Sequence, residues 1–240
     1  MAATKAATDS PDAGAPAQGL LLVDKPAGMT SHDVVQHVRR IYGQRSIGHL
    51  GTLDPFATGL LVLLLGRATR LATFLDAEPK VYEATISFGS ETDTDDETGT
   101  EIRRGELPLG TDVRSALGAL TGRISQVPPA YSAKSVDGTR AYDAARKGEP
   151  LALAATEVTV HNWAIVDLSP AQMKVVITCS GGTYIRALAR DLGRLVGSAA
   201  HLSALRRIQI GNFHVSEAVT LSTLEKGPVR VRSLRVVADA

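Results

Sequence analysis

Residues 48–65 read GHLGTLDPFATGLLVLLL, a loop-like segment followed by an apolar one. Its first twelve residues hold three glycines and Pro55, a composition typical of a loop. Its last six, Leu60 to Leu65, form an uninterrupted apolar run, which predicts a segment buried in the core. The run is far shorter than the roughly 20 apolar residues that cross a bilayer, so it indicates a globular protein.

On either side of this stretch the pattern alternates between strands and helices. Residues 19–23 predict a short strand, and apolar residues at helical spacing predict a helix that begins after Thr30 and Ser31 and ends at Gly43. Residues 80–89 alternate, with Tyr82, Ala84, Ile86 and Phe88 on one face of a predicted strand.

Further elements follow along the chain. The pattern predicts a helix over 112–121 and strands over 156–166, 173–179 and 229–237. Strands and helices without a strict alternation indicate an α+β sheet protein.

A helix is predicted after the glycines at 181 and 182. Its buried side carries Ile185, Leu188, Leu192 and Leu195. Its other side carries three arginines, Arg186, Arg190 and Arg194, and we interpret the last two as solvated. Six carboxylates lie in residues 90–101, and we interpret that segment as a solvated connection between strands.

Composition narrows the class of protein. The chain has 240 residues, of which 44% are hydrophobic and 21% are charged, as in globular proteins. A single cysteine excludes an internal disulfide, and the six histidines show no metal-ligand spacing. Because the N-terminus has no apolar targeting segment, we expect a cytoplasmic protein. Because ligand spacing is missing, we expect no metal or cofactor.

Charge is distributed unevenly. Net charge is +1, but residues 174–240 hold ten Lys and Arg against four Asp and Glu. This basic third predicts an anionic partner such as a nucleic acid. Aromatic residues make up only 4% of the chain, which argues against a platform that stacks several bases.

Two residues stand out as candidates for chemistry. Asp54 lies on a stiff, glycine-flanked loop, which suits a nucleophile, a general base or a carboxylate that caps a turn. Arg186 begins a helix after a glycine turn, where it is placed to bind a phosphate or to hold a carboxylate through two hydrogen bonds. The residues alone leave these alternatives open.

Five blocks of the sequence resemble the TruB family of bacterial tRNA pseudouridine synthases over about residues 19 to 222. The blocks run in the family's order and are 22–28, 48–59, 80–82, 127–132 with Gly138 and Tyr142, and 179–186 leading to 205–207. The resemblance implies a pseudouridine-synthase fold, with a central mixed, largely antiparallel β-sheet flanked by helices and loops.

The resemblance also implies a reaction. Uridine 55 in the T loop of tRNA is flipped out of its stack and isomerised to pseudouridine, without a metal or cofactor. Asp54 is the implied nucleophile, attacking either the sugar C1′ or the base C6, and Arg186 pairs with it and keeps it charged. Tyr82 stacks on the uracil, with a possible share in removing the C5 proton.

Other site residues follow from the same likeness. His49, Tyr184 and Leu205 match substrate-contacting positions of the family. Four cations are candidates for contacts with RNA phosphates, namely Lys25, Lys80, Arg206 and Arg207. The implied partner is the T arm of tRNA, with no membrane, guide RNA or obligate protein partner.

We expect three regions: an N-terminal tail over 1–18, a catalytic domain over 19–222 and a short basic segment over 223–240. The last is too short for the PUA-type RNA-binding domain that relatives usually carry. Alternative functions are a protein that binds and refolds tRNA, an activity the family can combine with catalysis, or a synthase for ribosomal or guide-directed RNA. A metal-independent hydrolase is more distant, because no Gly-x-Ser-x-Gly motif is present.

Overall fold

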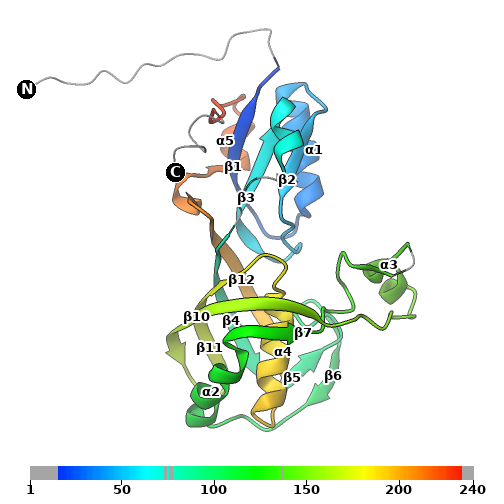
Figure 1. The fold of residues 1–240 in the computed structure, drawn as a ribbon, viewed down its shortest axis with the longest axis vertical. Coiled ribbons are helices and arrows are strands. Elements are labelled where there is room, and N and C mark those ends of the chain that lie inside the picture. Colours follow the sequence, from blue (N-terminus) through cyan, green and yellow to red (C-terminus); the bar gives the residue numbers. More distant parts are fainter. Residues whose placement is uncertain (1–15, 73–74, 76–77, 137, 234–240) are drawn as a thin grey trace, which may run out of the picture.

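A computed structural model describes residues 16–72, 75, 78–136 and 138–233 (Figure 1). The predicted tail over 1–18 therefore falls almost entirely outside the described residues. The strands are β1 (Gly19–Lys25), β2 (Ile47–Leu50), β3 (Thr58–Leu65), β4 (Lys80–Phe88), β5 (Ser90–Thr92), β6 (Glu101–Arg104), β7 (Gly122–Gln126), β8 (Ser135–Val136), β9 (Thr139–Arg140), β10 (Thr156–Leu168), β11 (Gln172–Cys179), β12 (Ala200–Ile210), β13 (Phe213–His214) and β14 (Val219–Thr220). The helices are α1 (Ser31–Tyr42), α2 (Gly110–Ala116), α3 (Ala141–Arg146), α4 (Ile185–Leu195) and α5 (Leu221–Leu224), with 3-10 turns at Gly66–Leu71, Leu117–Leu120 and Val215–Glu217.

One large sheet organises the fold. Its strand order is β14-β1-β3-β12-β4-β11-β10-β7, with β2 added to β3 and β13 added to β12. The pairs β1–β14 and β3–β12 are parallel, and the other described neighbours are antiparallel. Figure 1 shows α1 and α5 beside β1 to β3 in one lobe and α2 and α4 beside β4, β10 and β11 in the other, with β12 running between them. The α+β prediction is confirmed.

Strand β3 contains the unbroken apolar run, and its surroundings explain why the run does not alternate. Every residue from 59 to 65 is buried. Leu61, Leu63 and Leu65 belong to the apolar cluster that contains the buried face of α1, whereas Leu60 and Leu64 belong to a second cluster. A strand covered on both faces requires apolar side chains at every position, so the usual alternation is absent.

Helix α1 has both predicted ends. The Thr30 hydroxyl accepts a hydrogen bond from the Asp33 amide (3.0 Å), and the Asp33 carboxylate accepts one from the Thr30 amide (2.9 Å), which forms a capping box. Gly43 ends the helix in the left-handed conformation (φ 60°), which glycine adopts without steric cost.

The predicted strand over 80–89 is confirmed as β4, and the strands over 156–166 and 173–179 as β10 and β11. The helix predicted over 112–121 is α2 followed by a 3-10 turn. In α4 the prediction for Leu195 is wrong: this residue is 53% exposed, because the helix ends there and the chain turns at Gly197 toward β12. No strand over 229–237 is described; Arg232 forms a single bridge with Leu20, and residues 234–237 lie outside the description.

Two negative findings apply to the described residues. None of their helices is long and apolar enough to cross a bilayer. They also contain no group of three or more His, Cys, Asp and Glu placed to hold a metal ion.

Candidate active site

Asp54 and Arg186 meet where the two lobes join, although 132 residues separate them in the chain. Arg186 donates from Nε to Asp54 Oδ2 (2.9 Å) and from Nη2 to Oδ1 (3.0 Å), so the guanidinium holds the carboxylate by two hydrogen bonds. The Arg186 side chain is 4% exposed, whereas that of Asp54 is 33% exposed. The carboxylate is thus fixed in orientation and still open to solvent on one side.

The loop that carries Asp54 is held on both sides of this residue. Ser31, the first residue of α1, donates from its hydroxyl to the Leu53 carbonyl (3.2 Å) and accepts from the Leu53 amide (2.8 Å). On the other side, the Gly28 amide donates to the Pro55 carbonyl (2.8 Å). These bonds join the loop to the start of α1 and to the turn after β1, so Asp54 stands on a fixed backbone.

Two buried cations complete this support, which contradicts their predicted role as phosphate contacts. Lys25 is 0% exposed, and its ammonium donates to the carbonyls of Pro26 (2.8 Å), Met29 (2.7 Å) and Pro55 (3.3 Å). Burial lowers the pKa of Lys25 to about 8.

Arg207 is also 0% exposed. It donates to the carbonyls of Leu60 (2.8 Å), Gly51 (3.1 Å) and Thr52 (3.4 Å). Because the donors of Lys25 and Arg207 face backbone oxygens inside the protein, neither residue reaches a phosphate; both hold the Asp54 loop in place.

Glycine is required at the second residue of β3, just after this loop. Gly59 has φ +103°, and a Cβ there would lie 2.2 Å from the Arg207 carbonyl oxygen. Any larger residue would therefore push β3 away from β12 and disturb the contacts between Arg207 and the loop.

An apolar wall lies beside the fork. Leu53, Tyr82 and Leu205 belong to one buried cluster, and Tyr82 and Leu205 are 6% and 8% exposed. Tyr184 precedes α4 and is half-buried near Asp54 and Arg186. Burial raises the pKa of both the Tyr82 and Tyr184 phenols, so each is protonated at neutral pH. The Asp54 carboxylate acts electrostatically on both Tyr82 and Tyr184, and Leu205 packs in the same apolar cluster as Tyr82; the substrate contacts expected of these three residues stay predictions.

His49 and Lys80 lie at the margin of this site. His49 is half-buried near the end of β2, and burial lowers its pKa. Lys80 begins β4, and its ammonium lies close to Gly51, 3.2 Å from the position a Cβ would take. Burial lowers the pKa of Lys80 as well. Both side chains are near the Asp54 loop, but no direct bond to Asp54 is found.

Arg206 lies on the opposite face of the sheet. The register pairs Arg207 with Tyr82 and Arg206 with Glu83, so successive side chains of β12 point to opposite faces. Arg206 binds both carboxylate oxygens of Asp24 (2.7 and 3.0 Å) and its side chain is 36% exposed, so its contact with an RNA phosphate stays a prediction.

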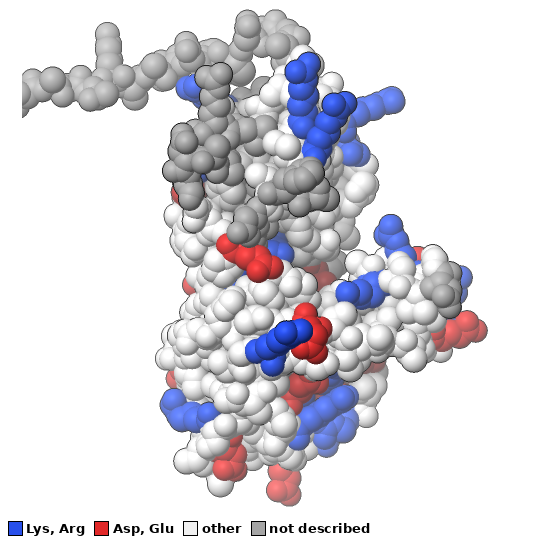
Figure 2. Space-filling model, in the orientation of Figure 1, with Lys and Arg blue, Asp and Glu red and all other residues white. Residues whose placement is uncertain are grey.

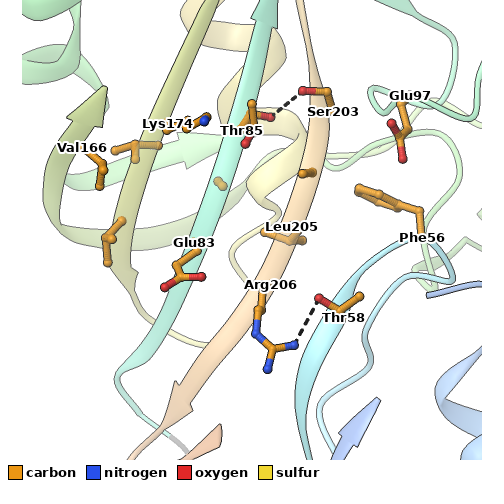
Figure 3. Close-up of a pocket in the computed structure, with 14 residues that line it drawn as sticks. Phe56, Thr58, Glu83, Thr85, Glu97, Val166, Lys174, Ser203, Leu205 and Arg206 are labelled. Carbon is orange, nitrogen blue, oxygen red and sulfur yellow. Dashed lines mark hydrogen bonds between the residues drawn. The ribbon is translucent and has the colours of Figure 1, made fainter. Parts of the chain in front are cut away.

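A hollow of about 380 Å³ occupies that opposite face (Figure 3). The close-up shows Arg206 directed toward Thr58, with Glu83 and Thr85 on the neighbouring strand β4. Asp54 and Arg186 do not line this hollow, although Phe56, two residues after Asp54, and Leu205 do.

The prediction that residues 90–101 form a solvated connection is wrong. Glu91, Asp95 and Asp96 are 1%, 6% and 5% exposed. Each faces one arginine of α4. Asp96 lies 3.6 Å from Arg186, Asp95 lies 2.9 Å from Arg190, and Glu91 binds Arg194.

Sequence reasoning missed Asp96 as a second carboxylate at Arg186, and it took Arg190, which is 8% exposed, for a solvated residue. The signal was present. Three arginines spaced by four residues on one helix face required three acceptors, and the acidic segment offered them.

Two family models match the chain. Residues 39–185 match the family described as "TruB family pseudouridylate synthase (N terminal domain)", and residues 186–233 match "tRNA pseudouridylate synthase B C-terminal domain". The chain is 48% identical to tRNA pseudouridine synthase B of Arthrobacter sp. (strain FB24), over 86% of this chain and 70% of that protein. It is 50% identical to the protein of the same name from Thermobifida fusca (strain YX), over 87% of this chain and 74% of that protein.

Solved structures share the fold. A chain of a Cbf5-Nop10-Gar1 complex aligns with a TM-score of 0.66 and 26% identity, over 89% of this chain and 58% of that chain. A chain of an H/ACA RNP bound to a substrate RNA containing 2′-deoxyuridine aligns with a TM-score of 0.63 and 26% identity, over 85% and 51%. The protein thus spans little more than half the length of these solved chains.

Proposed function

The chain belongs to the TruB family of pseudouridylate synthases, and on that basis we propose that it isomerises uridine 55 in the T loop of tRNA to pseudouridine. The observation that carries the mechanism is the fork between Arg186 and Asp54, with a fixed carboxylate that solvent still reaches. A substrate atom brought to this opening meets an oriented nucleophile.

The isomerisation rearranges bonds within the substrate uridine, and the proton that C5 loses passes to water. The bond from C1′ to N1 of the uracil breaks, the base turns, and a bond from C1′ to C5 forms. The C5 proton is lost and N1 gains a proton, so no oxidant or reductant enters. Asp54 attacks either C1′ or the base C6 and leaves when the new bond has formed.

The uridine must leave the RNA stack to reach Asp54, at a cost of a few kcal/mol. Tyr82, Leu205 and Leu53 provide an apolar wall against which the flipped uracil packs. Since the Tyr82 phenol is protonated at neutral pH, stacking is a better role for it than removal of the C5 proton. His49, Tyr184 and Lys80 lie at the rim, where the neighbouring nucleotides would lie.

The release of tritium from uridine C5 measures the reaction directly, because C5 loses its hydrogen only when pseudouridine forms. A tRNA transcript labelled with tritium at uridine C5 is expected to release one equivalent of tritium per tRNA. The same transcript with the T-loop uridine replaced by cytidine is expected to release none. Release that persists from the altered transcript would contradict the proposed target, and no release from either would contradict the activity.

A basic surface on α1 is suited to the stem of the T arm. Helix α1 begins at Ser31, which contacts the Asp54 loop, and ends about 18 Å away at its twelfth residue. Arg40 and Arg45 are exposed there and line a shallow hollow of about 390 Å³. Figure 2 shows Lys and Arg side chains gathered at this end of the molecule, with no acidic side chains among them.

Reversing charge at Arg40 and Arg45 is therefore expected to weaken tRNA binding. The variant Arg40→Glu/Arg45→Glu should raise KM for tRNA about tenfold at low salt with kcat unchanged. The slope of the logarithm of the binding constant against the logarithm of the salt concentration should become shallower, by the amount that about two lost phosphate contacts explain. The pair Arg104→Glu/Arg114→Glu, which changes two exposed arginines of β6 and α2, is the matched control. An unchanged KM would exclude this surface from the tRNA interface.

Three further points extend the proposal. We place the protein in the cytoplasm, where tRNA is its substrate, and we expect it to act without a guide RNA or an obligate protein partner. The Cbf5 chain was solved in a complex with Nop10 and Gar1, whereas the bacterial relatives are named tRNA pseudouridine synthase B. We also retain a single catalytic domain over 19–222; in the segment beyond it, Arg232 pairs with β1 and with Glu217.

A further inference from the structure

Arg190 lies one helical turn after Arg186 on α4 and takes no direct part in the proposed reaction. Its side chain is 9% exposed. It donates from Nη1 to Asp95 (2.9 Å), from Nη2 to the Val127 carbonyl (2.8 Å) and from Nε to Asp191 (2.9 Å). A buried arginine with all of these donors engaged fixes the segments that it touches.

Those segments are the ones that hold Arg186. Besides Asp54, Arg186 binds the Thr94 carbonyl (2.7 Å) and the Tyr131 carbonyl (3.0 Å). Thr94 is adjacent to Asp95, and Tyr131 lies four residues after Val127. Arg190 is thus bonded to both loops whose carbonyl oxygens orient the Arg186 guanidinium.

The turn at Asp95 is closely constrained. Asp95 has φ +60°, the only positive value at a non-glycine residue in the described chain. Its carbonyl accepts from the Leu202 amide (3.0 Å), and its amide donates to the Thr92 carbonyl (3.1 Å). The same turn places Asp96 3.6 Å from Arg186. A shift of Asp95 would move Thr94 and Asp96 together.

We propose that Arg190 and Asp95 are positioning residues for the isomerisation, which fix the acceptors of Arg186 and through them the orientation of the Asp54 carboxylate. This inference rests on the proposed function. It predicts that loss of the pair slows the chemical step and leaves tRNA binding unchanged, because the side chains of Arg190 and Asp95 are only 9% and 8% exposed.

The pair also predicts a dependence on pH. Burial raises the pKa of Asp95 to about 6, against the opposing influence of Arg190, Arg186 and Arg194, with Glu91 adding to the rise. As pH falls from 7 to 5, Asp95 gains a proton and its ion pair with Arg190 is lost. The rate of wild type should fall over this range by more than that of a variant without the carboxylate.

Two variants test the proposal. Asn tolerates the left-handed backbone of residue 95, so Asp95→Asn removes the charge without strain. Arg190→Lys keeps the charge but is unable to bind Asp95 and Val127 as a planar fork. Single-turnover rates should fall about 10²-fold in each, with the Kd for tRNA within about twofold of wild type. Arg194→Lys, which alters the ion pair with Glu91 one turn further on, is the matched control and should retain the wild-type rate.

A double variant tests whether Arg190 acts through Arg186. In Arg186→Lys protein, adding Arg190→Lys should lower the rate no further; a further 10²-fold loss would show that Arg190 does not act through Arg186. Wild-type rates in both single variants would also overturn the proposal.

A readout that needs no turnover separates this inference from the proposed function. The Nε–H signal of Arg186 in an NMR spectrum, assigned by its loss in Arg186→Lys, should exchange with water faster in Arg190→Lys. An unchanged exchange rate would overturn the inference even if wild type released no tritium.

Discussion

Replacing Asp54 with asparagine is expected to abolish turnover, with kcat lowered by about 10⁴-fold or more. Asparagine keeps the size of the side chain and one oxygen acceptor, but its neutral amide is a very weak nucleophile. The bonds that hold the loop at Leu53, Pro55 and Gly51 do not involve the Asp54 side chain, so the backbone should keep its position. Tritium release in a single turnover is the measurement.

Binding provides the control for this variant. The Kd of Asp54→Asn for tRNA should stay within a few-fold of wild type, and its thermal unfolding should show a folded protein. If the variant still promotes refolding of misfolded tRNA, the protein also assists tRNA folding independently of catalysis. Retained turnover would contradict the role of Asp54 as the nucleophile.

The sequence pattern alone predicts the strands and helices well where burial is local. The apolar run of β3 and the capped helix α1 follow from the order of side chains along the chain, because the apolar pattern and the capping residues lie within or next to each element. The fork between Asp54 and Arg186 does not follow in this way. It joins residues 132 positions apart, and only the resemblance to a family brought them together in advance.

The misplaced cations have a common physical cause. Charge and position predicted that Lys25 and Arg207 bind phosphate, but both are fully buried against carbonyl oxygens of the Asp54 loop. Whether a cation faces solvent or backbone depends on which strands become neighbours. The parallel contact between β3 and β12 that buries Arg207 links residues about 150 positions apart, and no local pattern predicts it.

In the acidic segment over 90–101 the wrong prediction concerned carboxylates, which were expected in water and are buried. A dense group of carboxylates ordinarily stays in water, since burial of a charge without a partner is costly. Glu91, Asp95 and Asp96 are buried because arginines of α4 neutralise them. Comparing the two segments would have predicted the pairing, whereas each segment taken alone predicted a solvated face.

Replacing Arg186 with lysine is expected to lower kcat by about 10²- to 10³-fold while KM for tRNA changes little. The substitution keeps the positive charge and a long side chain, but an ammonium is unable to present the planar pair of donors that binds both oxygens of Asp54. Lysine would also leave at least one of the Thr94 and Tyr131 carbonyls without its present donor.

The separation of charge from geometry is what makes this substitution informative. If the guanidinium acted only as a positive charge near Asp54, lysine would restore the rate, and a rate within about threefold of wild type would therefore exclude the fork as an orienting device. Arg194→Lys on the same helix provides the comparison, because its partner Glu91 is also held by Arg103 and lies away from Asp54. A large loss at residue 186 together with none at residue 194 would show that the two hydrogen bonds to Asp54, and not the basic character of α4, support the reaction.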